Sequence, residues 1–437
     1  MWNVKDFGAA GDGKTRDSSA IQAAIDKCAQ SGGGTVICGA GTYLVACLEL
    51  KSGVNLHLTS GAVLKALPGR EDYPADMPKG IVLRADGAEN FSLSGEGTVL
   101  GPGQEPWGRA EWPRPPLDFR VKLLLFENCK NVSICGLTFR MSDCWALHFR
   151  LCENVHIEHC KIFNNYFRAN SDGIDPDSCK NFFISNCHII AGDDCIVAKT
   201  TQNHPMENLV VTNCILESIS TALKLGTESL ADFRDILFSN CIIRNSFIGL
   251  GIYVKDGAVV ERVKFNNITI ENPVADHKTI NPVFIDIEKR HSDSKIGRVR
   301  DLVFSNITIN SSYSSLIQGM PESPIENLTL SNINIRVPRA IDFSGRSKNV
   351  GGDRTTEDDG RDTTFITKPA YMAIAHAKGL TIDNFRVTIE ENGSYNRAAL
   401  YVYDAEDVNL KNVKRLPKNV PPVILENCRD IVYETNE

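Results

Sequence analysis

Apolar and polar residues alternate along most of the chain after residue 30, in segments of about six residues that end at Asn, Gly or Ser. Alternation with a period of two is typical of β-strands, whose successive side chains point to opposite faces. Helical periodicity is concentrated near the start, in the segment SSAIQAAIDKCAQ at residues 18–30. The pattern predicts an all-β fold preceded by one short helix.

The strand-like segments recur at a fixed interval. Five of them begin 27 residues apart, at positions 154, 181, 208, 235 and 262. One column of the repeat contains Cys160, Cys187, Cys214, Cys241 and then Ile268. The neighbouring column contains Asn186, Asn213, Asn240 and Asn267. Short strands that stack like residues on like predict a parallel β-helix, in which each coil covers the one before it.

Looser copies of the repeat extend this prediction toward both ends of the chain. They begin at positions 131, 301, 327, 379 and 407. We therefore expect a single parallel β-helix domain over residues 1–437. Residues 1–34 would form an N-terminal strand and capping helix, and residues 35–437 would form coils of about 27 residues, with insertions near 101–120 and 345–368.

The segment GAAGDGKT, Gly8–Thr15, matches the phosphate-binding pattern G-x-x-x-x-G-K-[ST]. A phosphate loop works inside alternating β and α units, whereas this chain has one such helix followed by strands. The alternative is that Asp17, Ser18 or Ser19 begins a helix that covers the open apolar end of the solenoid, and that the glycines at 32–34 end it. We favour the capping helix over nucleotide binding.

Composition narrows the possible partners and compartments. The 437 residues carry a net charge of −7, with no basic tract interleaved with aromatics, so we predict no nucleic-acid partner. No apolar stretch is long enough for a membrane span, and no signal-peptide layout opens the chain. These features and the 14 cysteines predict a cytoplasmic protein as written, or a periplasmic or secreted one if a leader has been removed.

The densest group of candidate catalytic residues lies in the segment from Asn170 to Thr200. Its aspartates are Asp172, Asp175, Asp177, Asp193 and Asp194. Counting by 27 residues puts Asp172, Lys199 and Tyr253 in one outward column, with Gly226 between the last two. Asp193 and Asp194 belong to the coil after Asp172 and would flank the same cleft.

The same count predicts that Asp194 lies under Thr221 and that Glu228 lies under Lys255. Three clustered carboxylates repel one another, which is expected to raise the pKa of at least one of them. One protonated acid beside ionised neighbours suits glycoside hydrolysis, which needs an acid for the leaving oxygen and a base for water.

Several residues of this segment also fit purely structural roles. Asp175 and Asp177 are more readily interpreted as turn-forming residues. The segment DGIDPDS lacks the Gly and Glu of a calcium loop, and we predict neither a metal nor a cofactor. Lys199 could form a structural ion pair with Asp172, and Cys195 is more readily interpreted as a stacked core residue than as a nucleophile.

Four segments carry a resemblance to a known family: NSDGID, GDDCIVAK, SGVNLHLTSGAVLKA and the opening NVKDFGAAGDGKTRDSSAIQAAIDKCAQSGGGTVICGAGTYL. They resemble the polygalacturonases and related pectin-degrading enzymes of glycoside hydrolase family 28. The resemblance implies a right-handed parallel β-helix and an inverting hydrolase of a pectin-type glycan. Carried over to matching positions, it implies that Asp193 is the acid and that Asp172 and Asp194 are the bases.

This sequence departs from the family pattern at two places. Thr221 stands at the usual active-site His, with Lys224 added nearby, and Tyr253 stands at the usual Arg, whereas Lys255 is kept. These changes affect the groups that orient the acid and bind substrate. The predicted substrate-binding residues are Asn170, Lys199, Thr221, Lys224, Glu228, Tyr253 and Lys255.

The leading hypothesis is therefore an inverting hydrolase of a galacturonic-acid or rhamnogalacturonan-derived oligosaccharide. The long insertions predict exo action, because they could wall off the groove. Trp107, Trp112 and Trp145 are candidates for stacking on sugar rings, with ordinary packing an equal alternative for Trp145. A β-helical polysaccharide lyase, with Lys199 or Lys224 as base, and a catalytically lapsed glycan-binding solenoid are the alternatives. The sugar, the linkage and the oligomeric state are left open.

Overall fold

The computed structural model describes residues 1–108, 119–272, 280–339, 370–390 and 397–434. Within these residues, parallel strands are joined by one α-helix, α1 (Ser18–Gln30), and two 3-10 helices, η1 (Val4–Phe7) and η2 (Arg70–Asp72). The predicted all-β parallel β-helix with an N-terminal capping helix is confirmed. None of the described helices combines the length and hydrophobicity that a bilayer span requires.

The chain divides by its internal contacts into two compact units. The first comprises Met1–Ala198 and Leu209–Ile219, and the second comprises Lys199–Asn208 and Ser220–Glu437. The single-domain organisation stays a prediction. Of the two predicted insertions, residues 109–118 of the first and all of the second lie outside the described residues.

The strands up to residue 100 are β1 (Trp2–Asn3), β2 (Asp12–Arg16), β3 (Gly34–Cys38), β4 (Gly41–Val45), β5 (Leu48–Glu49), β6 (Val54–Leu58), β7 (Ala62–Ala66), β8 (Gly80–Asp86), β9 (Glu89–Gly95) and β10 (Thr98–Leu100). The strands that follow, up to residue 218, are β11 (Val121–Glu127), β12 (Lys130–Cys135), β13 (Thr138–Arg140), β14 (Leu147–Arg150), β15 (Glu153–Glu158), β16 (Lys161–Phe163), β17 (Ile174–Asp177), β18 (Lys180–Ser185), β19 (His188–Ala191), β20 (Ile196–Thr200), β21 (Met206–Thr212) and β22 (Ile215–Ser218). The remaining strands are β23 (Thr221–Ser229), β24 (Phe233–Ser239), β25 (Ile242–Arg244), β26 (Ile248–Val254), β27 (Val259–Glu271), β28 (Asn281–Ile287), β29 (Arg298–Asn310), β30 (Ser315–Gln318), β31 (Ile325–Val337), β32 (Ala370–Ile389), β33 (Ala398–Leu416), β34 (Val423–Glu426) and β35 (Arg429–Glu434).

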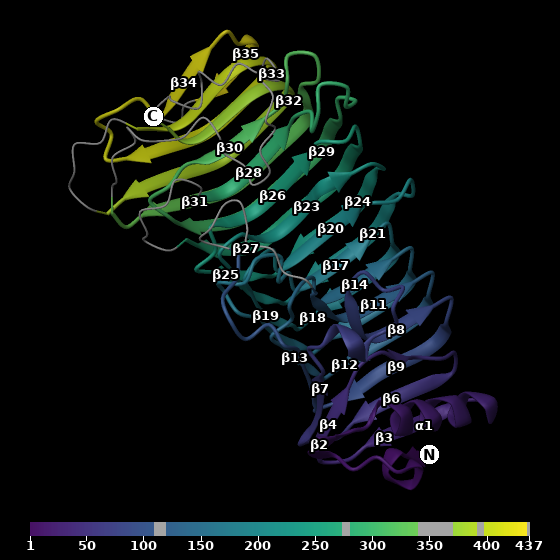
Figure 1. Cartoon of the computed structure of the whole chain (residues 1–437). Coiled ribbons are helices and arrows are strands. Elements are labelled where there is room, and N and C mark those ends of the chain that lie inside the picture. The colour runs from purple at the N-terminus through teal and green to yellow at the C-terminus, as the bar shows by residue number, and fades with distance from the viewer. Residues whose placement is uncertain (109–118, 273–279, 340–369, 391–396, 435–437) are drawn as a thin grey trace. The chain divides into compact units, whose positions relative to one another are not determined.

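The register of the strands follows the 27-residue period inside each unit. In the first unit Glu153 faces Lys180, and His188 faces Ile215. In the second unit Thr221 faces Ile248. Figure 1 shows the resulting rows, with β8, β11, β14 and β17 on successive coils of the first unit and β23, β26, β28 and β30 on successive coils of the second.

Asparagine ladders mark the turns between strands. In the first unit the side-chain amide of Asn154 donates to Asn131 over 3.0 Å, and that of Asn181 donates to Asn154 over 2.9 Å. Asn131, Asn154 and Asn181 have φ angles of 53° to 56°, in the left-handed region that Asn tolerates better than most residues. The turn therefore requires Asn for both its backbone shape and its side-chain amide.

The interior of the coils is filled by stacked apolar side chains. Phe126, Phe149 and Phe182 are fully buried on three successive coils, with ring centroids 5.6 and 5.1 Å apart. All 14 cysteines are unpaired thiols, and several of them stack in columns; the backbone N–H of Cys152, for example, donates to the sulfur of Cys179. Cysteine here acts as a small hydrophobic residue of the core.

The N-terminal helix begins after Asp17, as predicted. The carboxylate of Asp17 accepts hydrogen bonds from the backbone N–H groups of Ala10 and Gly11, over 2.7 and 3.1 Å. Asp12 similarly accepts from the N–H groups of Lys14 and Thr15. The amides that a phosphate would need are therefore bound to carboxylates of the chain itself, which supports the capping interpretation.

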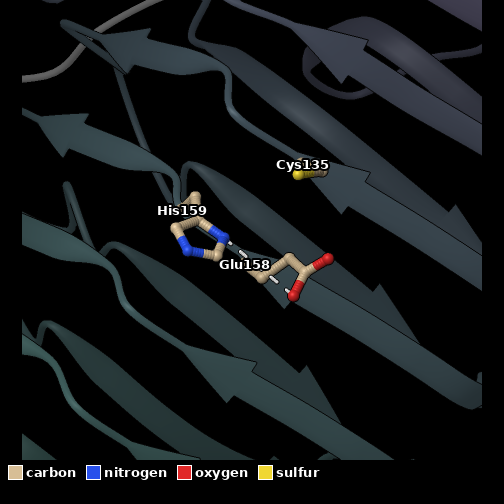
Figure 2. A group of neighbouring side chains, drawn as sticks. All are labelled: Cys135, Glu158 and His159. Atoms are coloured by element: carbon tan, nitrogen blue, oxygen red, sulfur yellow. Dashed lines mark ion pairs between the residues drawn. The ribbon is translucent and has the colours of Figure 1, made fainter.

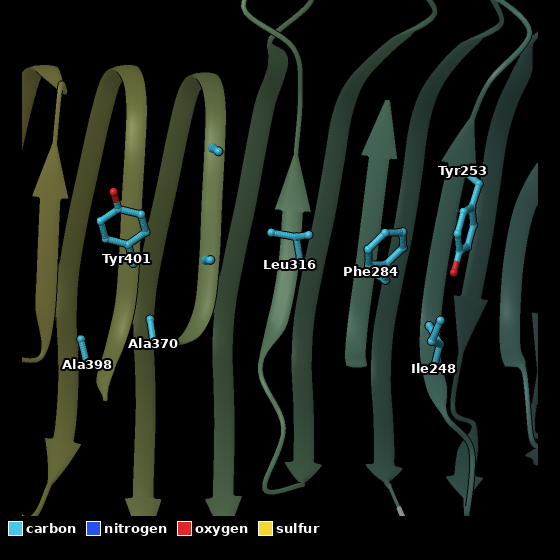
Figure 3. Packing of buried hydrophobic residues seen from close by; sticks show 9 residues of the cluster. Ile248, Tyr253, Phe284, Leu316, Ala370, Ala398 and Tyr401 are labelled. Carbon is cyan, nitrogen blue, oxygen red and sulfur yellow. The ribbon is translucent and has the colours of Figure 1, made fainter. Parts of the chain in front are cut away.

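An outward-facing apolar cluster lies in the second unit, on β26, β28, β30, β32 and β33. Figure 3 shows Phe284, Leu316 and Tyr401 on separate strands of this face. By register, Gly251, Phe284, Leu316, Ala373 and Tyr401 form one column that continues from Lys224. The polar positions predicted for the site thus give way to buried apolar ones in later coils.

Candidate active site

Three aspartates of the first unit meet as the sequence predicts. Asp172 lies just before β17, and Asp193 and Asp194 follow the end of β19. One carboxylate oxygen from each lies within 4.8 Å of the others. Asp172 and Asp194 are buried, whereas Asp193 is half-buried. The arrangement brings one more accessible acid beside two enclosed ones.

Backbone contacts hold these acids in place. The N–H of Asn170 donates to Oδ2 of Asp193 over 2.9 Å, and the N–H of Gly173 donates to the carbonyl of Asp194 over 2.9 Å. The hydroxyl of Ser218 donates to the carbonyl of Asp193. Gly192 is required because a Cβ at that position would lie 2.1 Å from the carbonyl oxygen of Asn165. The acid-bearing turn is therefore packed directly against the preceding coil.

Arg120 joins this site although the 27-residue period does not predict it. Its guanidinium donates to the carbonyl of Ala169 over 2.7 Å and to Oδ1 of Asn170 over 3.3 Å. Asp143 binds Arg120 and also accepts from Nε of Arg168 over 2.6 Å. Counting by 27 misses Arg120 because the coil that joins β11 to β14 has a 23-residue register.

A buried polar chain lies next to the acids. Nζ of Lys122 is 2.9 Å from Nδ1 of His148, and Nε2 of His148 is 3.2 Å from Asp177. Burial, together with the charge of Lys122, lowers the pKa of His148 to about 3. Burial also lowers the pKa of Lys122. His148 is therefore neutral over the ordinary pH range.

The interpretation of Asp175 and Asp177 as turn residues is wrong. Both lie in β17 and are fully buried, and Asp175 faces His148 across the ladder. The period-two pattern of this strand is hidden because its outward positions carry acids in place of solvent-exposed residues. Asp177 binds His148, so its carboxylate belongs to the buried polar chain.

Cys195 and two of the candidate tryptophans have clear positions in this unit. Cys195 is fully buried, and burial raises the pKa of its thiol, which is consistent with the interpretation of Cys195 as a core residue. Trp107 lies under the guanidinium of Arg120, 4.4 Å from ring centroid to charge centre. Trp145 is half-buried and contacts the ammonium of Lys122, 4.6 Å away. Trp112 lies outside the described residues.

Most predicted substrate-binding residues lie in the second unit. Nζ of Lys199 donates to Oε2 of Glu228 over 3.3 Å, so its ion-pair partner in this unit is Glu228. Burial alone would raise the pKa of Glu228, but the charges of Lys199 and Lys224 outweigh it and lower the pKa. The ammonium of Lys224 lies 4.8 Å from the ring centroid of Tyr253.

Tyr253 and Thr221 are buried. Tyr253 packs against Phe284 with ring centroids 5.0 Å apart and belongs to the apolar cluster of Figure 3. A Cβ on Gly226 would lie 2.1 Å from the carbonyl oxygen of Tyr253, so glycine leaves room for the tyrosine backbone. The ring of Tyr253 supports the ammonium of Lys224, and its participation in substrate binding stays a prediction.

Two residues of this unit were missed by counting coils. Lys255 is buried in an ion pair with Glu288, and Arg290 binds both carboxylate oxygens of Asp256, over 2.6 and 2.9 Å. Glu288 and Arg290 escaped the count because the register from β26 to β28 is 33 residues. Arg290 supplies a guanidinium in the unit where Tyr253 replaces the family's arginine.

Side chains of the types that bind metals come close at two places in the described residues. One is the aspartate trio, and the other is Cys135, Glu158 and His159, shown in Figure 2. Burial and the nearby Glu158 raise the pKa of the Cys135 thiol, which disfavours the thiolate that a metal needs. The predicted absence of metal and cofactor stays a prediction.

Comparison with known proteins decides the family. The family model described as glycosyl hydrolases family 28 matches residues 28–351, more than half of the chain. The chain belongs to glycoside hydrolase family 28. This family 28 chain is similar to a probable polygalacturonase of Vitis vinifera, with 28% identity over 221 residues that cover 45% of the chain and 44% of the relative. An exopolygalacturonase of Platanus acerifolia is 27% identical over 206 residues, covering 45% and 52%. The chain thus spans about half the length of the curated relatives it matches.

Two solved structures share the fold of this family 28 chain. A hyperthermoactive exopolygalacturonase from Thermotoga maritima superposes with a TM-score of 0.68 at 24% identity, covering 76% of this chain and 86% of that one. A family 28 exopolygalacturonase from Yersinia enterocolitica superposes with a TM-score of 0.63 at 19% identity, covering 93% and 78%. At these identities the likeness establishes the parallel β-helix.

Proposed function

We propose that this family 28 protein is an inverting glycoside hydrolase that cleaves a galacturonic-acid or rhamnogalacturonan-derived oligosaccharide from its end. The observation that carries the proposal is the meeting of Asp172, Asp193 and Asp194 within 4.8 Å. Both the pectin-type substrate and exo action are favoured by the names of the similar proteins, which include exopolygalacturonases.

In the proposed reaction Asp193 donates a proton to the glycosidic oxygen as the bond to the anomeric carbon breaks. Water attacks that carbon from the opposite face and gives its proton to Asp172 or Asp194. The greater exposure of Asp193 suits the acid, which must reach the leaving group. The two buried carboxylates suit the bases that hold water.

The stereochemical outcome is the sharpest point of the proposal. Inverting enzymes typically separate their carboxyl groups by about 6.5–9.5 Å, and retaining ones by about 5–5.5 Å. The nearest oxygens of this trio are closer than either range. Inversion is therefore proposed from the family resemblance, in which two carboxylates share the water, and the product anomer tests it directly.

Lys224 is the proposed group for the sugar carboxylate. Lys199 and Lys255 are more buried and bind Glu228 and Glu288, whereas Lys224 is half-buried against Tyr253. An ammonium held on an aromatic ring is positioned without loss of its charge. This geometry favours an acidic sugar at the position that Lys224 reaches.

Proton NMR tests the function. Wild-type protein and the Asp193→Asn variant are incubated with trigalacturonate and with rhamnogalacturonan oligosaccharides, and new anomeric signals are followed with time. We expect a new reducing end of inverted configuration from wild type and a rate about 10²–10⁴-fold lower from the variant. Asp383→Asn, an exposed aspartate of β32, is the matched control.

Three results would contradict the proposal. A retained anomer would exclude inversion, and an unsaturated uronate signal would assign the reaction to a lyase. Undiminished activity of Asp193→Asn would exclude Asp193 as the acid. Absence of any product across the panel, while the protein binds the oligosaccharides, would leave a glycan-binding solenoid.

A further inference from the structure

A cavity of about 730 Å³ lies near the C-terminal end of the second unit. This volume is within the range of about 300–1,000 Å³ that is usual for small-ligand sites. Four cationic side chains line it, and no acidic side chain of the described residues does. They are Arg386, Lys414, Arg415 and Lys418, which we call the cationic groove.

The cationic groove breaks the charge pattern of its unit. Elsewhere neighbouring coils pair opposite charges, as between Asp235 and Arg262 at 2.7 Å and between Glu406 and Arg429 at 2.9 Å. Here Arg386 of β32 faces Lys414 of β33. Like charges at facing positions of a ladder repel and destabilise it. A chain of net charge −7 therefore concentrates positive charge at a place where its own packing does not need it.

Three of these cations lack a nearby carboxylate in the part of the chain that the structure describes. Within it, no acidic group lies within ion-pair distance of Arg386, Lys414 or Lys418. Arg415 is buried, and Nε of its guanidinium donates to the carbonyl of Arg397 over 2.6 Å. Its hydrogen bonds to Pro417 and Asn419 also go to neutral oxygens. The groove thus has a buried cation at its wall and three more cations around it.

We propose that the cationic groove binds a uronate-containing oligosaccharide at a position separate from the catalytic aspartates. Carboxylates spaced along a sugar chain match several cations along a groove, and Tyr433 in the lining offers a ring face for a sugar. The choice of a uronate rests on the proposed function, because it makes the ligand an acidic glycan. The groove would hold the polymer near the enzyme between cleavage events.

Calorimetric titration of trigalacturonate into full-length Asp193→Asn protein tests this, because that background prevents cleavage. Adding Lys414→Glu and Lys418→Glu is expected to weaken one class of sites by about tenfold or more and to reduce its salt dependence. The control adds Lys264→Glu and Lys130→Glu, which are exposed lysines away from the groove. Lys418→Gln alone is a milder variant whose smaller loss guards against misfolding of the double variant.

Specificity is tested with the methyl ester of trigalacturonate, which lacks the charges and is expected not to bind at the groove. Equal binding of the ester, or unchanged affinity in both groove variants, would overturn the proposal. Displacement of trigalacturonate by inorganic phosphate or a single-stranded oligonucleotide at lower concentration would assign the groove to another anion. Hydrolysis by wild type is measured separately, so a failed groove and a failed hydrolase give different results.

Discussion

The backbone N–H of Asn170 donates a 2.9 Å hydrogen bond to Oδ2 of Asp193. A carboxylic acid accepts at one oxygen and carries its proton on the other, so this bond assigns the proton of the proposed acid to Oδ1. Asn170 has a φ angle of 56°, and its side chain binds Arg120. The orientation of the acid thus depends on a turn that Arg120 holds from the preceding strand.

Replacing Arg120 by Met is expected to lower kcat about 10–100-fold and to leave KM nearly unchanged, because small displacements of a catalytic group are costly. The variant loses the hydrogen bonds to Ala169 and Asn170. Steady-state kinetics on the oligosaccharide cleaved by wild type provides the measurement. Arg140→Met, an exposed arginine of β13, is the control, and Arg120→Lys should restore part of the rate. A change in KM alone would mean that Arg120 binds substrate instead.

The glycine before Asp193 should tolerate no side chain. In Gly192→Ala the new Cβ would meet the carbonyl of Asn165 at 2.1 Å, so the backbone must shift. We expect a loss of about 1–3 kcal/mol in unfolding free energy, measured by urea denaturation, together with reduced activity. Gly39→Ala, where a Cβ meets nothing within 4 Å, should be close to neutral. Similar losses in both variants would contradict the close packing.

His148 should make the protein less stable in acid. Its folded pKa of about 3 is below the usual value near 6.5, so the unfolded chain binds the proton more readily. Between these two values stability falls as pH falls, by about 1.4 kcal/mol per pH unit from this group, and above the window the effect is absent. Denaturation of His148→Gln across this range should show a shallower slope than wild type. His156→Gln, at an exposed histidine, should keep the wild-type slope.

The asparagine ladder should contribute through both the backbone and the amide. Asn154→Ala is expected to cost about 1–2 kcal/mol, because alanine is strained at a φ of 56° and both ladder bonds are lost. Asn154→Gly removes the same bonds without the strain and should cost less. Urea denaturation of the two variants separates the terms. Equal losses would mean that the backbone conformation contributes little.

Sequence periodicity predicted the coils well wherever their length stays at 27 residues. The facing of Glu153 with Lys180 and of Thr221 with Ile248 follows directly from counting. Counting failed where a coil changes length. The 23-residue register after β11 hid Arg120, and the 33-residue register after β26 hid Glu288 and Arg290.

The sequence by itself determined the repeating strand pattern, the capping helix and the identity of the three aspartates, because these depend on local alternation, on the fixed period and on motifs of a known family. Tertiary structure alone decided the partners of the charged groups. Asp177 turned out to bind His148, and Lys199 turned out to bind Glu228. The cationic groove was invisible for the same reason, since Arg386 and Lys414 meet only through a register of 28 residues. Ion pairs form across coils, and which residues face each other depends on the exact length of every coil between them.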